Sequence, residues 1–283
     1  RAKYVTVCIP AENVAAARPR LERVEADVIG NFKRLGVQSQ PLDGRERLAL
    51  LHGQLHPGSR EPFRFSWGDI AKTGLGTKDF IAPDSFDFRQ PRLFRMGQYW
   101  GAASYLQILA SELSDKLLAE ILELDAEMTL HIQTVDQLKA IKTIKGKISD
   151  IGKMKVEEQR KAVRAGYDPD ILPPDLITFS KDAAELLADL QSRNERMFLL
   201  TFTVVNLAPT RQRLENDIFT VGGIAQKYNC TLKRLDWQQE QGFVSSLALG
   251  GNEVEIQRGM TTSSTAIFIP FMTRELRMAG PSL

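Results

Sequence analysis

The sequence has few of the residues that build disulfide scaffolds or cysteine metal sites. Its 283 residues include two cysteines, Cys8 and Cys230, far apart and without a CxxC pair. This usage argues against an extracellular disulfide framework and against a cysteine zinc site, and it indicates a reducing compartment. We therefore expect a cytoplasmic protein.

Long apolar runs are also missing. The longest, MFLLTFTVVNLA from Met197 to Ala208, is about a dozen residues with polar interruptions, whereas a membrane-spanning helix needs about 20 apolar residues. We expect a buried strand there. The sequence begins at Arg1 and enters a strand pattern at once, with no signal peptide, as expected for a piece of a longer protein.

A strong net charge is absent as well. The 37 basic and 35 acidic residues leave a formal net charge of +2. The chain as a whole is therefore not a basic surface for nucleic acid or an anionic membrane, and any such surface must be local. The length and the hydrophobic content of 43% suit a soluble core of one large or two ordinary domains.

A phosphate-binding loop is suggested by KTGLGTKDF, Lys72 to Phe80, but its order is wrong. A P-loop has Gly, four residues and then Gly-Lys-Ser/Thr, so that Lys and a hydroxyl serve the phosphates and Mg²⁺. Here Thr77 stands before Lys78, and Asp79 occupies the place of the hydroxyl. We expect a surface turn, and neither a nucleotide site nor any other cofactor in this chain.

Metal and catalytic constellations are equally incomplete. His52 and His56 are four residues apart, but Gly53 stands where an HExxH site has Glu, and His131 is alone in a strand pattern. No Ser with a paired base and no carboxylate pair stands out. We expect no metal site, no catalytic residue and no enzymatic activity in this chain alone.

An internal duplication organises the sequence. Residues 3–58 align with residues 196–251 without a gap, so that Leu21 falls on Leu214. The identical pairs are Arg18/Arg211, Arg20/Arg213, Leu21/Leu214, Glu22/Glu215, Val28/Val221, Gly30/Gly223, Leu42/Leu235, Asp43/Asp236 and Gly58/Gly251. We call residues 3–58 the first repeat and residues 196–251 the second repeat.

Each repeat has the pattern strand, helix, strand, helix, followed by another strand. The strands expected around the first repeat are Tyr4–Ile9, Gly36–Leu42 and Pro62–Trp67, and those around the second are Met197–Val205, Cys230–Leu235 and Ser264–Phe271. The expected fold is α+β, with duplicated β-α-β-α-β halves of the ferredoxin-like or split β-α-β kind.

The residues between the repeats differ in character. A β-meander is expected over Ser85–Tyr105, then a helix over Ser114–Leu124 and a strand over Met128–Thr134. A helical hairpin follows, whose first helix repeats apolar residues at Leu138, Ile141, Ile144, Ile148 and Ile151, and whose second runs from Ser180 to Asn194. The expected domains are residues 1–84, 85–195 and 196–283.

The strongest charge feature lies in this hairpin, from Lys139 to Arg164. Its basic residues are Lys139, Lys142, Lys145, Lys147, Lys153, Lys155, Arg160, Lys161 and Arg164, against three acidic ones. Three interpretations are open: a solvated helix face, a surface that docks against anionic lipid or an acidic partner, and an arm that binds the phosphates of nucleic acid. The last use is disfavoured because the stretch lacks interleaved aromatics that stack on bases.

Several stretches together resemble a known family: RPRLERVEADVIGNFKRLGVQ, FRFSWGDIAKTGLGTKDFIAP, LHIQTVDQLKAIKTIK, LQSRNERMFLLTF, IAQKYNCTLKRLDWQQEQGF and RGMTTSSTAIFIPFMTREL. They are similar to the N-terminal region of the CagE/TrbE/TrsE-type conjugative-transfer ATPase of type IV secretion systems, in the form carried by Gram-positive conjugative elements. The resemblance extends over essentially the whole sequence.

The resemblance implies an assembly role at the cytoplasmic face of the cell's inner membrane. It implies that a P-loop ATPase domain using ATP and Mg²⁺ follows beyond Leu283, that the parent is a homo-hexamer, and that membrane subunits of the secretion channel are the partners. No catalytic residue of the family carries over to a position here. We expect a non-catalytic scaffolding and docking domain; the alternative is a nucleic-acid-binding module of a mobile genetic element.

Overall fold

The computed structural model describes residues 3–59, 61–108, 114, 116–168, 170–192 and 195–268. The described residues form a mixed α+β structure with one antiparallel sheet of seven strands and nine α-helices, which confirms the expected fold class. The sheet order is β1-β2-β3-β5-β4, with β6 also beside β3 and β7 also beside β5.

The strands are β1 (Phe86–Asp87), β2 (Phe94–Met96), β3 (Tyr99–Ile108), β4 (Glu127–Thr134), β5 (Met197–Ala208), β6 (Cys230–Arg234) and β7 (Arg258–Thr261). The helices are α1 (Val14–Arg34), α2 (Gly44–Leu55), α3 (Trp67–Thr73), α4 (Lys116–Leu122), α5 (Gln137–Ala165), α6 (Pro174–Ser192), α7 (Arg211–Lys227), α8 (Gln239–Ser246) and α9 (Thr262–Ala266), with a 3-10 turn, η1, at Thr77–Phe80.

The chain divides into two compact units, each described by itself below. Unit 1 comprises Arg1–Leu109, Ile121–Thr129 and Phe202–Glu255. Unit 2 comprises Ala110–Glu120, Leu130–Thr201 and Ile256–Leu283. The division into three domains at residues 84 and 195 stays a prediction.

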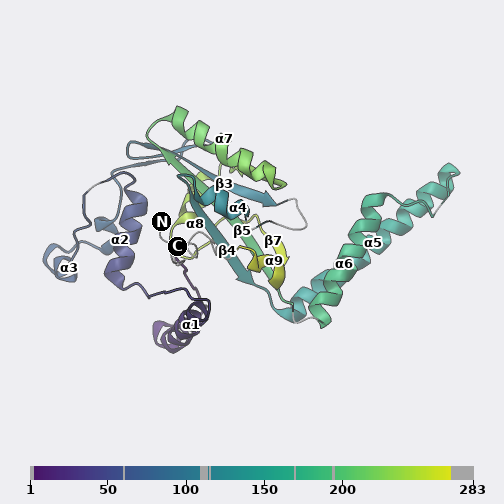
Figure 1. Cartoon of the computed structure of the whole chain (residues 1–283), viewed down its shortest axis with the longest axis horizontal. Helices are drawn as coiled ribbons and strands as arrows, with labels where there is room; N and C mark the ends of the chain where they lie inside the picture. Colours follow the sequence, from purple (N-terminus) through teal and green to yellow (C-terminus); the bar gives the residue numbers. More distant parts are fainter. Residues whose placement is uncertain are drawn as a thin grey trace, which may run out of the picture. The chain divides into compact units, whose positions relative to one another are not determined.

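In unit 1 the second repeat forms a split β-α-β arrangement. Both β5 and β6 are antiparallel to β3, which separates them, and α7 connects them. Helix α7 covers one face of these strands (Figure 1) through Leu214 and Ile218, which cluster with Ala102 of β3 and Ala208 of β5. The strand, helix, strand and helix expected for the second repeat are therefore confirmed at β5, α7, β6 and α8.

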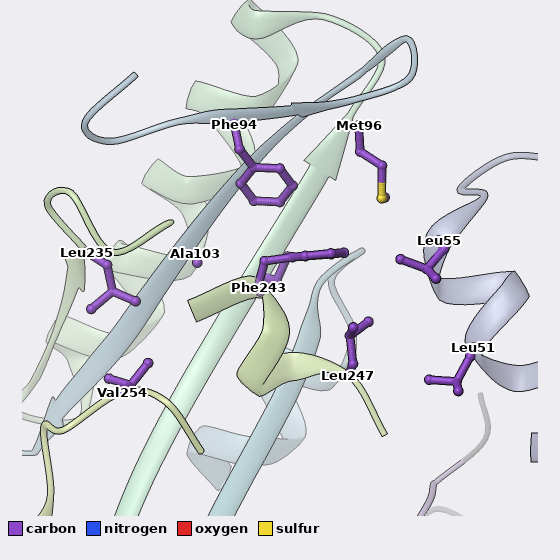
Figure 2. Packing of buried hydrophobic residues seen from close by; sticks show 10 residues of the cluster. Leu51, Leu55, Phe94, Met96, Ala103, Leu235, Phe243, Leu247 and Val254 are labelled. Atoms are coloured by element: carbon purple, nitrogen blue, oxygen red, sulfur yellow. The ribbon is translucent and has the colours of Figure 1, made fainter. Parts of the chain in front are cut away.

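The opposite face of the unit 1 sheet carries the larger apolar cluster (Figure 2). Neighbouring residues of a strand point to opposite faces, so Ala103 of β3 faces this cluster whereas Ala102 faces α7. Phe94 and Phe243 lie at its centre, with ring centroids 5.0 Å apart. Leu51 and Leu55 of α2 close it from the first repeat.

Helix α8 lies very close to β3. A Cβ at Gly242 would stand 2.6 Å from the Ala103 Cβ, so no larger residue fits without a backbone shift. The buried Gln239 side chain accepts a hydrogen bond from the Ala103 N–H at 2.7 Å and donates to the Ala103 carbonyl at 2.9 Å. The first bond gives the buried Ala103 N–H a partner, whereas the Ala103 carbonyl also accepts from the Leu235 N–H at 3.1 Å.

The strands expected in the first repeat do not form, although its helices α1 and α2 do. Tyr4–Ile9, Gly36–Leu42 and Pro62–Trp67 are all outside the described strands. A strand needs a neighbour for its N–H and C=O groups. In unit 1, β5 pairs with one edge of β3, and β2 and β6 pair with the other, so the central strand has no edge left.

The last expected strand is also displaced. Strand β7 ends at Thr261, and α9, which begins at Thr262, includes the first three residues of the predicted strand Ser264–Phe271. The hydroxyl of Thr261 accepts from the Ser264 N–H, and its carbonyl accepts from the Thr265 hydroxyl at 2.7 Å, which favours a helical turn. Residues 269–271 lie outside the described residues.

The expectations for the residues between the repeats are mostly confirmed. Strands β1, β2 and β3 form the meander, and α4, β4, α5 and α6 follow in the predicted order. Helix α6 begins at Pro174, six residues before the predicted start at Ser180. Proline suits the first turn of a helix, because the N–H it lacks would have no helical partner there.

Candidate functional site

The helical arm of unit 2 consists of α5, α6 and their connection, residues 137–192, and it carries the nine basic residues. The two helices lie side by side along the arm (Figure 1). Ala140 and Ile144 of α5 pack against Leu190 of α6, together with Ile141 and Ile148. The Gln137 side chain donates to the carbonyls of Leu190 and Glu195, at 2.8 and 3.0 Å, and closes the base of the arm.

Local signals define the length of α5. The Asp136 carboxylate accepts from the Lys139 N–H at 3.0 Å and caps the first turn. Gly166, in the left-handed region at φ 76°, ends the helix. At about 1.5 Å per residue, the 29 residues between them extend about 44 Å.

A basic stripe follows the side of α5 that faces away from α6. The stripe consists of Lys142, Lys153, Arg160 and Arg164. The last three follow Lys142 by 11, 18 and 22 residues, which is about three, five and six helical turns. They therefore lie on one line along the helix, and all four are exposed. The stripe is opposite Ile144, which is buried against α6.

The other five basic residues have different surroundings. Lys139 and Lys145 lie on the two flanks of the stripe, whereas Lys147 lies nearer the packed face; all three are exposed. Lys155 is half-buried and donates to the Ser180 hydroxyl of α6 at 2.8 Å, so it belongs to the packing between the helices. Lys161 donates to Glu158 at 2.6 Å, and this bond raises the pKa of Lys161.

The described ion pairs of α5 are local. Lys153 pairs with Asp150 at 3.1 Å, and Lys161 pairs with Glu158. Such exposed pairs are weak, so Lys153 can exchange its partner for another anion. Helix α6 is acidic, because it contains Asp175, Asp182, Glu185 and Asp189 and one basic residue, Lys181. The stripe on α5 is therefore the cationic side of the arm.

An exposed apolar line runs beside the stripe, and sequence reasoning missed it. Val156 and Val163 follow Leu138 by 18 and 25 residues, which is about five and seven turns, and Leu138 is 78% exposed. Leu138 was expected in the packed face, but the structure places Ala140 there instead. Spacing over several turns was the signal that could have identified this line.

The two candidate histidines stack on each other and do not form a metal cluster. The ring centroids of His52 and His56 are 4.0 Å apart, and His56 Nδ1 lies 3.0 Å from the His52 carbonyl oxygen. Burial lowers the pKa of His52, and the neighbouring His56 lowers it further. Within the described residues, no group of three or more His, Cys, Asp or Glu side chains could hold a metal ion.

The glycine-rich segment after α3 is a turn, as predicted. Gly74 ends α3 in the left-handed region, at φ 71°, and η1 follows. The Asp79 carboxylate accepts the Gly76 N–H at 2.7 Å. A bound phosphate would need this Gly76 N–H as a donor, but the hydrogen bond to Asp79 already occupies it within the turn.

Glu127, in unit 1, is a buried carboxyl group that the sequence did not indicate. One of its oxygens, Oε2, is buried and has no hydrogen-bond partner among the described residues. Burial raises the pKa of Glu127 to about 7, although a hydrogen bond with Gln54 lowers it in part. Gln54 belongs to α2 and also accepts from the Ala248 N–H at 3.3 Å.

Comparisons with known proteins leave the argument to the geometry. No protein-family model matches the sequence, and no curated protein is a significant match. Among the residues the structure describes, no helix is both long enough and apolar enough to cross a bilayer.

Proposed function

We propose that the chain is a non-catalytic docking domain whose helical arm binds an anionic membrane surface. The observation that carries this proposal is the basic stripe, Lys142, Lys153, Arg160 and Arg164, on the side of α5 opposite its packed face. A one-sided line of cations on a long helix can meet a flat anionic surface with all its members at once.

The expected strength follows from the charge count. Each Lys or Arg near an anionic bilayer contributes about 1 kcal/mol. Four residues therefore contribute about 4 kcal/mol, or about a thousandfold in partitioning, at physiological salt. The exposed Leu138, Val156 and Val163 add apolar contact beside the cations, as on helices that lie in a membrane interface.

The wider role rests on the resemblance to conjugative-transfer ATPases. In this proposal the domain anchors the motor to the inner-membrane channel subunits at the cytoplasmic face, within a hexameric parent. ATP and Mg²⁺ act in the ATPase domain of that parent. The described residues contribute a scaffold and a docking surface to it.

Vesicle binding tests the proposal directly. The protein is mixed with vesicles containing about 30% anionic lipid and with neutral vesicles, and the bound fraction is measured by sedimentation across a salt series. We expect binding to the anionic vesicles that weakens as salt rises. Changing Lys142, Lys153, Arg160 and Arg164 together to Glu should abolish it.

A matched variant controls for net charge. Lys33, Arg45, Lys72 and Lys78 are exposed basic residues of unit 1, and changing these four to Glu alters the net charge by the same amount. This variant should retain most of the vesicle binding. Equal loss in both variants would contradict a specific role for the arm.

Duplex DNA is the competing ligand. A nucleic-acid module would bind DNA with an affinity that falls steeply as salt rises, because phosphate contacts release counterions. Tight DNA binding that the stripe variant removes, together with weak vesicle binding, would replace the membrane proposal with the nucleic-acid alternative.

A further inference from the structure

The contacts between α5 and α6 fix the direction in which each residue of the arm points. Gln137, at the start of α5, donates to the carbonyl of Leu190, near the end of α6, so the two helices are antiparallel. The side that each helix turns toward the other is centred on Ile144 in α5 and between Leu176 and Leu190 in α6. Successive residues are about 100° apart around a helix, so the other positions follow from these centres.

An antiparallel pair of helices has two broad sides, one on each face of the plane that contains both axes. A two-fold axis perpendicular to this plane exchanges the helices and leaves each broad side in place. Residues at equal angles from the two contact centres, in the same rotational sense, therefore project from the same broad side. The exposed residues of α5 and α6 can be assigned to one side or the other in this way.

One broad side of the arm carries exposed apolar residues from both helices, and we call it the apolar side. Leu138, Val156 and Val163 lie about 100° to 120° from Ile144 in one rotational sense. Ile177 lies about 120° from the centre of the α6 contact in the same sense, so it joins them. Val163 and Ile177 are 63% and 52% exposed. Among the described residues of the two helices, no Asp or Glu projects from this side.

The opposite broad side, which we call the acidic side, has a different charge. Its exposed apolar residues are Met154 of α5 and Phe179 of α6, which are 53% and 60% exposed. They lie among carboxylates, because this side also carries Asp150, Glu157, Asp175, Asp182 and Asp189. Both broad sides present apolar residues, so the placement of the acidic residues is what distinguishes them.

Cations border the apolar side. Lys142 and Arg160 of the basic stripe lie about 160° from Ile144, in the same sense as the apolar residues, and Lys145 lies about 100° from it. A partner that fits this side offers negative charge above an apolar layer. An anionic bilayer has both, because its head groups can meet the cations while the acyl boundary meets the apolar side chains. Duplex DNA offers phosphates but no continuous apolar layer.

We propose that the arm lies along an anionic bilayer on its apolar side, with the acidic side toward water. Leu138, Val156, Val163 and Ile177 then reach the boundary between head groups and acyl chains, over a length of about 38 Å on α5. This inference rests on the membrane binding proposed above. It adds the side of the arm that meets the lipid, and it adds α6 to the contact.

Charge disfavours the two other ways in which the arm can meet a bilayer. Contact through the acidic side brings the line of Asp175, Asp182 and Asp189 onto an anionic surface, where like charges repel. Insertion by the end of the arm brings Asp168 and Asp170 to the same surface, although Ile171 in this connection is 74% exposed. The apolar side alone combines cations with apolar residues and has no carboxylate.

Single labelled cysteines measure which side lies in the lipid. In a Cys8→Ser background, with Cys230 buried, an environment-sensitive fluorophore is placed by Val163→Cys, Ile177→Cys, Met154→Cys or Phe179→Cys. Each side of the arm is then reported from both helices at positions of similar exposure. On vesicles with about 30% anionic lipid, emission at 163 and 177 should rise at least about twofold and shift to the blue. Labels at 154 and 179 should change little.

Charge-neutral variants test the same assignment without a label. Val163→Asn with Ile177→Asn should weaken vesicle partitioning by at least about tenfold, because two exposed apolar side chains lose their contact with lipid. Met154→Asn with Phe179→Asn is the matched control and should bind as the parent does. Neither pair alters the net charge, so the salt dependence of the residual binding should stay as in the parent. Circular dichroism checks that the helices are retained.

The outcomes separate this inference from the proposed function. A parent protein that does not bind anionic vesicles would remove the membrane function, and this inference with it. Binding with equal responses at 154, 163, 177 and 179, or equal losses in the two Asn pairs, would overturn the assigned side while the membrane function stands. The strongest response from a label at Ile171→Cys would also overturn it, because the arm would then insert by its end.

Discussion

The first and second repeats share the same order of apolar segments, yet they form different structures. In the second repeat, β3 separates β5 and β6 and buries the stripe of α7. In the first, α1 forms with no buried residue, and the segments around it stay outside the sheet. A helix closes its hydrogen bonds within itself, whereas a strand depends on a neighbour.

The helices of the two repeats also differ in how much they contribute to the buried core of unit 1. Helix α1 contributes nothing to the buried core, but α2, in the same repeat, buries Leu48, Leu51 and Leu55. Stability should therefore depend on α7 and α2 and depend little on α1. Matched substitutions at corresponding positions test this comparison.

The largest expected effect is at the leucine that both repeats share. Leu214→Ala removes a fully buried side chain from under α7 and should lower the unfolding free energy by about 3 kcal/mol. Leu21→Ala changes a partly exposed position and should cost less than about 1 kcal/mol. Urea unfolding measures both. Equal costs would mean that α1 is covered as well as α7 is.

The next effect concerns Glu127, whose partner Gln54 lies on α2. Because burial raises the pKa of Glu127 to about 7, the folded state holds a proton that the unfolded state releases above about pH 4.5. The unfolding free energy should therefore fall as pH rises from about 4.5 to about 7, by up to about 3 kcal/mol.

Glu127→Gln sharpens this prediction, since it keeps the shape and removes the titrating group. The variant should lose this part of the pH dependence and should be more stable than the parent at pH 8. Glu255→Gln, at an exposed carboxyl, is the control. Unfolding curves at several pH values would contradict the assignment if the variant and the parent fell in parallel.

The smallest effect is at the glutamate that both repeats share. Glu215 accepts two hydrogen bonds from the Arg234 guanidinium of β6, and these lower the pKa of Glu215. Glu215→Gln should cost about 1 kcal/mol. Glu22, the counterpart, pairs with Arg18 in an exposed pair on α1, so Glu22→Gln should cost less than about 0.5 kcal/mol.

High salt provides the check on this pair of variants. Added salt should reduce both costs, and it should reduce the exposed Arg18–Glu22 contribution first, because solvent screens it more fully. A larger cost at Glu22 than at Glu215 would show that the ion pair between α7 and β6 adds little to the second repeat.

The sequence predicted α1, α2 and α4 to α8 because helix signals are local, but it missed α3 and placed a strand over part of α9. The Asp43 cap with Glu46, the Gly166 end and the apolar spacing of Ile141, Ile144 and Ile148 all lie within a few turns. It also predicted the charge of the arm. It did not predict which cations face outward, because Lys155 turns toward Ser180 on another helix.

The sequence by itself determined the α+β composition, the repeated helices and the basic α5, because short-range spacing and capping are written along the chain. The tertiary structure alone decided which strand patterns became strands. Segment Tyr4–Ile9 and β5 have the same kind of apolar strand pattern, but β2, β5 and β6 already pair with the edges of β3. A strand is completed by residues distant in sequence, so its own pattern is insufficient to place it in a sheet.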